Sequence, residues 1–405
     1  MEKTIATTLP ERPLSMRNQL GLVLQRFSRI SIIALVVVIC AGNITNSFFL
    51  KWGFRDDQRP EIYNADNYLE SYSLAGMMYG SAPKPFVYRA AVPRVIKWAV
   101  DRLDPAFQEK VFSGIKEYDS LRKSYASGLP AKYWTAEVAI TYHALYMLIV
   151  GVNILLLFTV YRIARFHGFA FGQSLLFVAA TSLVYPLTFQ QGGYFYDFIE
   201  QLGALVACYL VLRKRMLLAT LTIFAFAFNK ETFFLVPVAL FALTAGQLSL
   251  RQRLAWAGAQ LVGCAVARYV ITSPYAVNPG GAVEIHLMEN LKFWLNPASF
   301  LTFYNLVGRG IYTPSVQNPI VLVPALIFFR CAWRNSPPNY RYFFHAAFWP
   351  LLLLFAVFGF KDEVRNFSLA FPALVLLATQ GARNFDSLFS WARKGGDRGT
   401  GGNIG

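Results

Sequence analysis

The most informative polar residues of this chain interrupt its apolar runs. Asn229-Lys230-Glu231-Thr232 separates two short apolar stretches. Ionisable groups at membrane depth are costly and usually line a cavity, so Lys230 and Glu231 are candidate ligand-binding residues. A lysine at the start of a helix suits a phosphate. The alternative is a structural turn in which Asn229 caps the next helix and Glu231 lies in its first turn.

Two further polar segments have the composition of a sugar or phosphate site. Tyr194, Tyr196 and Asp197 follow a pair of glycines, and aromatic faces beside carboxylates suit sugar rings. An interfacial aromatic belt is the alternative reading of the tyrosines. Segment 361–366 contains Glu363 and Arg365, which could hold a phosphate or a sugar. It could equally be an ordinary charged turn in which Asp362 caps the last helix.

A long polar segment, 51–134, contains the candidate general bases. Asp57 and Asp66 could each accept a proton from a hydroxyl group, and Arg89 could hold an anion. Tyr68 follows Asp66 closely and is a candidate substrate contact. The structural alternatives are that Asp66 begins a helix and that Asp57 is simply solvated.

The composition indicates a membrane protein. The chain has 405 residues, of which 55% are hydrophobic and only 15% are charged. Its net charge of +16 comes from basic residues that punctuate the apolar runs, which argues against nucleic-acid binding. The four cysteines show no metal-ligand or disulfide spacing. His286 beside Glu284 and Glu289 is a weak metal motif, so no cofactor is required, although a divalent metal remains possible.

Hydropathy predicts an all-α polytopic fold with ten membrane segments, at about 20 residues for a full span. The segments are 31–50, 136–161, 169–189, 198–212, 216–228, 233–245, 254–272, 316–333, 342–360 and 367–379. Basic residues cluster in alternate connections, which predicts that both termini are cytoplasmic. The predicted organisation is a cytoplasmic segment 1–30, a membrane domain 31–383 and a disordered cytoplasmic tail 384–405. Within loop 51–134, stretches 63–79 and 88–103 are expected to form interfacial helices.

This arrangement resembles the GT-C superfamily of membrane glycosyltransferases. The resemblance rests on the long first extracytoplasmic loop with Asp66 and Tyr68, on Tyr88-Arg89, on the turn at Lys230, and on Glu363-Val364-Arg365 before the last span. It covers most of the chain as architecture, although the motifs are short. The adjacent Asp-Glu pair that some branches carry in the first loop does not occur at that loop position here, and the chain as given does not include the large C-terminal domain of some members.

The resemblance implies transfer of a sugar from a polyprenyl-phosphate donor, at the outer face of the cytoplasmic membrane, to a glycan or lipid-linked acceptor. Asp66 would be the base, with Asp57 in reserve, and Arg89, Lys230 and Arg365 would contact the donor phosphate. Tyr68, Tyr196, Asp197, Glu231 and Glu363 would contact substrate. Two alternatives remain open. One is a glycan polymerase or ligase using diphosphate-linked donors, and the other is a lipid or glycan transporter.

Overall fold

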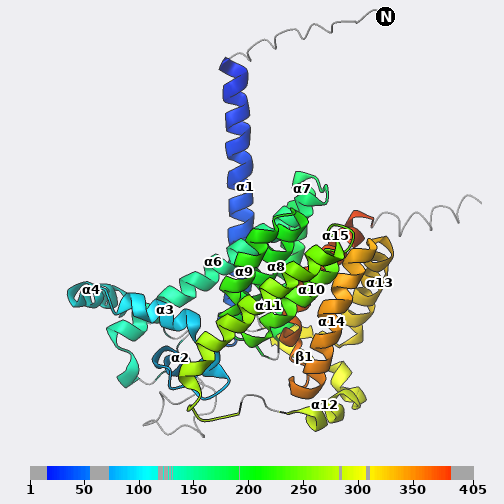
Figure 1. The fold of residues 1–405 in the computed structure, drawn as a ribbon. Coiled ribbons are helices and arrows are strands. Elements are labelled where there is room, and N and C mark those ends of the chain that lie inside the picture. Colours follow the sequence, from blue (N-terminus) through cyan, green and yellow to red (C-terminus); the bar gives the residue numbers. More distant parts are fainter. Residues whose placement is uncertain are drawn as a thin grey trace, which may run out of the picture.

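The computed structural model describes residues 16–54, 73–116, 122, 126, 129, 131–190, 192–281, 285–306 and 311–384. These residues form a bundle of α-helices and one small β-hairpin (Figure 1). The α-helices are α1 (Met16–Phe49), α2 (Leu74–Tyr79), α3 (Ala91–Val100), α4 (Pro105–Lys116), α6 (Ala136–Phe166), α7 (Phe171–Val184), α8 (Phe195–Leu212), α9 (Met216–Ala227), α10 (Leu235–Leu243), α11 (Leu250–Thr272), α12 (Leu287–Trp294), α13 (Pro319–Asn335), α14 (Pro338–Phe358) and α15 (Phe371–Arg383).

Short 3-10 helices and one hairpin complete the described chain. The 3-10 helices are η2 (Phe86–Arg89), η3 (Ala131–Tyr133), η4 (Tyr185–Phe189), η5 (Glu231–Phe234), η6 (Ser273–Tyr275), η7 (Pro297–Leu301) and η8 (Val364–Ala370). Strands β1 (Phe303–Leu306) and β2 (Ile311–Pro314) pair antiparallel, with Phe303 opposite Pro314. The all-α prediction did not include this hairpin, whose two strands have four residues each.

Local sequence explains where several helices begin. The Thr135 side chain accepts a hydrogen bond from the Val138 backbone amide at the start of α6. Ser249 and Gln252 form a capping box that opens α11. Helix α1 begins at Met16, ahead of the expected start of the first span at residue 31, because no proline interrupts the helix between these positions.

Six described helical segments are long and apolar enough to cross a membrane, which confirms a multi-pass membrane protein. They are Val23–Phe49, Ala136–Phe166, Phe171–Phe189, Phe195–Leu212, Leu250–Tyr275 and Pro338–Phe358. The other four predicted segments are also helical, as α9, α10, α13 and α15, but none of them is among these six. The count of ten membrane segments therefore stays a prediction.

The connections that contain both acidic and basic residues lie at one end of the bundle. Lys51, which follows α1, donates to the Gln190 carbonyl beyond α7, and Arg365 contacts Asp197 in the first turn of α8. The hairpin, α2 and α12 lie at this end as well (Figure 1).

The basic connections meet at the opposite end. There Arg29 of α1 lies over the Phe171 ring at the start of α7, 6.0 Å from its centroid. Arg253 of α11 donates to the Phe241 carbonyl of α10. The helices thus alternate in direction as the basic clusters of the sequence predict.

Helices α9 and α10 are too short to cross a bilayer. They have 12 and 9 residues, about 18 and 14 Å of helix, against a hydrocarbon core of about 30 Å. Helix α9 follows the basic residues 213–215, so only about 18 Å of helix separates these residues from the turn between α9 and α10. Lys230 and Glu231 are in this turn.

Helix α8 is the centre of the bundle, since 83% of its residues are buried. It packs against α6 and α9. Gly203 of α8 permits the close approach of α9, because a methyl carbon at this position would lie 2.4 Å from Cγ of Phe226.

We expect Gly203→Ala to destabilise the protein by about 1–3 kcal/mol, because the added methyl forces α8 and α9 apart. Gly151→Ala is the matched control, since Gly151 is also helical and a methyl there would meet nothing within 4 Å. Thermal unfolding of both variants in the same detergent measures the difference. Equal melting temperatures for the two variants would refute the role of Gly203 in packing.

Candidate functional site

Arg89 is the first predicted site residue that the fold brings into contact with others. It ends η2 and forms a two-pronged ion pair with Glu231, in which Nε is 3.1 Å from Oε2. A third nitrogen donates to the Tyr196 hydroxyl at 2.8 Å. Burial lowers the pKa of Arg89, but the Glu231 carboxylate and Tyr196 raise that pKa by more, to well above its usual value. The guanidinium is therefore a fixed positive charge.

Lys230 is buried between two carboxylates of α8. Its Nζ lies 2.9 Å from Asp197 and 3.0 Å from Glu200, and its side chain is 6% exposed. Asn229 does not cap the next helix, because its amide donates to the Tyr196 carbonyl at 2.7 Å. The predicted Asn229 cap is therefore wrong, whereas Glu231 does lie in the first turn of the following helix, η5.

Arg365 connects the segment before the last helix to the same carboxylates. It donates to Asp197 at 3.3 Å and to Glu363 at 3.0 Å. Despite burial, the Glu363 and Asp197 carboxylates raise the pKa of Arg365 above its usual value. Ser368, three residues later, donates to Glu200 at 2.5 Å.

Gly192 allows segment 363–365 to pack against α8. A methyl carbon at this position would lie 2.7 Å from Oε1 of Glu363 and 3.0 Å from Nε of Arg365. The backbone amide of Tyr194, two residues further on, donates to Asp197 at 3.2 Å. Asp197 is thus held by the start of its own helix as well as by the two cations. A carboxylate in the first turn of a helix is also favoured by the helix dipole.

The structure brings together seven of the predicted site residues from four separate segments. They are Arg89, Tyr196, Asp197, Lys230, Glu231, Glu363 and Arg365. Asp57, Asp66 and Tyr68 lie outside the described residues.

Sequence reasoning missed four members of this network: Glu200, Thr232, Arg268 and Ser368. Thr232 and Ser368 donate to Glu200, and Arg268 of α11 lies 3.8 Å from Glu231. Glu200 and Arg268 each interrupt an apolar run, and that signal could have identified them. The two hydroxyl residues carry no comparable signal.

The charges of this network balance. Four cations (Arg89, Lys230, Arg268 and Arg365) face four carboxylates (Asp197, Glu200, Glu231 and Glu363) through the ion pairs of the described residues. Buried charges persist only when they are paired and hydrogen-bonded. An anionic ligand would therefore need a cation that the network can release.

A second polar cluster, centred on Asp362, anchors segment 361–366 to the hairpin and to Gln317. Asp362 accepts hydrogen bonds from Tyr304 of the hairpin and, at 3.3 Å, from Gln317. It does not cap the last helix. Burial lowers the pKa of the neighbouring Lys51, and the Asp362 carboxylate offsets only part of this decrease. The hairpin therefore helps to position Arg365.

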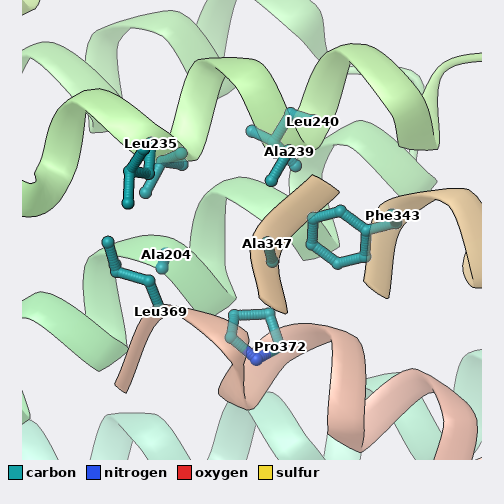
Figure 2. A pocket seen from close by; sticks show the side chains of 9 residues that line it. Ala204, Leu235, Ala239, Leu240, Phe343, Ala347, Leu369 and Pro372 are labelled. Carbon is teal, nitrogen blue, oxygen red and sulfur yellow. The ribbon is translucent and has the colours of Figure 1, made fainter. Parts of the chain in front are cut away.

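Two small cavities lie near the network, and neither can hold a sugar. One, of about 10 Å³, is enclosed by apolar side chains of α8, α10, α14, η8 and α15 (Figure 2). The other, also about 10 Å³, is bordered by Tyr194, Asp197, Gln201 and Arg365. A cavity of this size holds at most one water, and only the second has polar partners for it.

Among the described residues, no group of three or more His, Cys, Asp or Glu side chains is arranged to hold a metal ion. The imidazole of His286 packs against the Phe360 ring, with centroids 5.3 Å apart. Glu284, its predicted neighbour, lies outside the described residues.

The fold and the network together define a multi-pass membrane protein with a buried ionic cluster at one end of its bundle. Comparison with protein-family models, curated proteins and solved structures finds no match to this chain.

Proposed function

We propose that this protein is a membrane glycosyltransferase of the GT-C type, which transfers a sugar from a polyprenyl-phosphate donor to a glycan or lipid-linked acceptor at the extracytoplasmic face of the cytoplasmic membrane. One observation carries this proposal. Five residues that the sequence alone predicts as site residues lie in one network, in which the Tyr196 side chain contacts both Arg89 and Lys230: Arg89, Lys230, Glu231, Asp197 and Arg365. Such convergence is expected of a binding site, whereas isolated charged turns need not meet.

The depth of the network favours a lipid-linked ligand. Helix α9, with its 12 residues, reaches only about 18 Å from the basic connection before it. The turn with Lys230 is therefore below the outer limit of a hydrocarbon core of about 30 Å. A phosphate attached to a lipid chain reaches this depth readily, whereas a free sugar nucleotide would have to leave water.

The proposed reaction is an inverting direct displacement. The acceptor hydroxyl oxygen attacks the anomeric carbon, while the bond between that carbon and the donor phosphate oxygen breaks and its electron pair leaves with the phosphate. Asp66 takes the hydroxyl proton. The guanidinium groups at the site offset the charge that develops on the leaving phosphate. Lys230, with two carboxylates already bound, holds the site together.

The test is a mass-spectrometric profile of envelope glycans in a strain that lacks this protein. We expect one sugar unit to be lost, to be restored by the wild type, and to be restored to only about a tenth by Arg89→Lys, because an ammonium cannot form the two-pronged contact. Arg94→Lys is the matched control, since Arg94 is a nearby exposed arginine. Glycans that are unchanged in the deletion strain would refute the transferase.

A transporter is the second candidate, and the two short helices favour it. Interrupted helices whose ends meet charged residues at membrane depth occur at the substrate sites of transporters. Here α9 and α10 are interrupted at the turn that contains Lys230. A transporter predicts that the lipid-linked sugar accumulates on the cytoplasmic side of the membrane in the deletion strain. The transferase predicts that the unused donor accumulates on the outer side.

A further inference from the structure

The balanced network has two parts with opposite net charge. The inner group consists of Lys230 and Arg365 with Asp197, Glu200 and Glu363, and it carries one excess negative charge. The outer group consists of Arg89 and Arg268 with Glu231, and it carries one excess positive charge. The Tyr196 hydroxyl accepts from Arg89 of the outer group at 2.8 Å, and the ring centroid of the same residue lies 5.8 Å from Nζ of Lys230 in the inner group. An anion is therefore favoured at the outer group.

Glu231 lies between the two guanidinium groups of the outer group. Its Oε2 is 3.1 Å from Nε of Arg89 and 3.8 Å from the nearest nitrogen of Arg268. A carboxylate and a phosphate present similar pairs of oxygens to an arginine fork. The Glu231 carboxylate thus occupies the place that a ligand phosphate would take.

Arg268 is the cation of the network whose side-chain N–H donors make no hydrogen bond to the described residues. Its guanidinium makes no hydrogen bond to any residue that the structure describes, and its only ion pair there is the 3.8 Å contact with Glu231. Its side chain is 26% exposed, whereas that of Lys230 is 6% exposed. The guanidinium lies over the Tyr88 ring, 4.7 Å from its centroid. This stacking fixes the orientation of the guanidinium without using its donors.

The position of Arg268 supports a functional role. It is in the apolar helix α11, which is long enough to span a membrane. An arginine there that is held by one long ion pair is costly, and such residues usually face a ligand pathway. A single ion pair at 3.8 Å is a poor compensation for this cost.

We propose that Arg268 and Arg89 form a phosphate clamp that Glu231 occupies when no ligand is bound. The phosphate of the ligand takes the donors of Arg268 first and then competes with Glu231 for Arg89. The assignment of this phosphate to a lipid-linked donor rests on the proposed function. The clamp itself rests only on the three side chains.

The experiment measures binding of dodecyl phosphate and of inorganic phosphate to the purified full-length protein in a neutral detergent, by native mass spectrometry and calorimetry. We expect Arg268→Gln to weaken binding of dodecyl phosphate about 10- to 100-fold, because a charge-assisted contact is lost. We expect Glu231→Gln to tighten it about fivefold or more, because the competing carboxylate is removed. Arg268→Lys should bind with intermediate affinity.

Arg251→Gln is the matched control, since Arg251 is an exposed arginine at the other end of the same helix. It should bind as the wild type does. A clamp predicts weaker binding for Arg268→Gln and tighter binding for Glu231→Gln. A purely structural role of these residues predicts weaker binding for both variants. Wild-type binding by Arg268→Gln, or weakened binding by Glu231→Gln, overturns the proposal. A preference for dodecyl phosphate over inorganic phosphate identifies a lipid source, and equal affinities identify free phosphate.

Failure of the clamp and failure of the transferase give different results. If Arg268→Gln binds dodecyl phosphate normally while the deletion strain lacks a sugar unit, the clamp is wrong and the transferase stands. If Arg268→Gln loses binding while the glycans of the deletion strain are complete, the clamp stands and the transferase is wrong.

Discussion

Replacement of Lys230 with methionine is expected to destabilise the folded protein by about 3–5 kcal/mol, because it leaves buried carboxylates without their partner. Asp197 and Glu200 are 5% and 0% exposed, and Lys230 contacts both. Arg365 and the hydroxyl groups near Glu200 compensate only in part. Methionine has a similar length, so the effect comes from the lost charge rather than from a cavity. Chemical unfolding of the purified protein in detergent measures the change.

Lys97→Met is the matched control for this experiment. Lys97 also bridges two carboxylates, but Asp101 and Glu137 are 42% and 31% exposed. Exposed ion pairs contribute about 0–1 kcal/mol, so this variant should remain nearly as stable as the wild type. Combining Lys230→Met with Asp197→Asn and Glu200→Gln should recover part of the lost stability, because no buried charge is then left unpaired by the missing lysine. Equal stability of the Lys230 and Lys97 variants would contradict the assignment of a buried ionic core.

The second large effect is expected at Asp66. Replacement with asparagine should reduce sugar transfer by about 10²–10⁴-fold, the range that a positioned general base contributes. Asparagine keeps the size and polarity of the side chain but cannot accept the proton of the acceptor hydroxyl. The rate of transfer from a polyprenyl-phosphate sugar to an acceptor, measured with equal amounts of purified protein, tests this expectation. Unfolding in the same detergent should show unchanged stability.

Asp57→Asn is the informative comparison, because Asp57 is the reserve candidate in the same loop. If Asp66 is the base, Asp57→Asn should retain most of the transfer rate. A large loss at Asp57 with little change at Asp66 would move the role to Asp57. Near-wild-type rates in both variants would mean that neither aspartate is the base.

The sequence alone was sufficient to predict the membrane class and the direction of the helices. Whether a segment such as α6 or α14 is apolar enough for lipid is a property of consecutive residues. The alternation of basic connections is equally local, and the two ends of the bundle follow it. The unusual cost of a charge beside an apolar run also pointed to Lys230 and Glu231 without any knowledge of their partners.

Other features depend on residues that are far apart in the chain. Arg89 meets Glu231 across 142 positions, and Arg365 meets Asp197 across 168. No local pattern specifies which carboxylate pairs with which cation, because that choice is made when α8 packs against its neighbours. For the same reason the cap expected of Asn229 proved wrong once its partner, the Tyr196 carbonyl, was known.

The amino-acid sequence thus determined that this is a multi-pass membrane protein, and it indicated which charged residues are too costly beside apolar runs to be there without a purpose. Only the tertiary structure decided that these charges neutralise one another, and that Arg268 retains donors that the described residues do not use. Hydrophobic transfer is additive over neighbouring residues and can be summed along a sequence. Ion pairing falls off within a few ångströms and depends on the dielectric surroundings, so it exists only after the helices have packed.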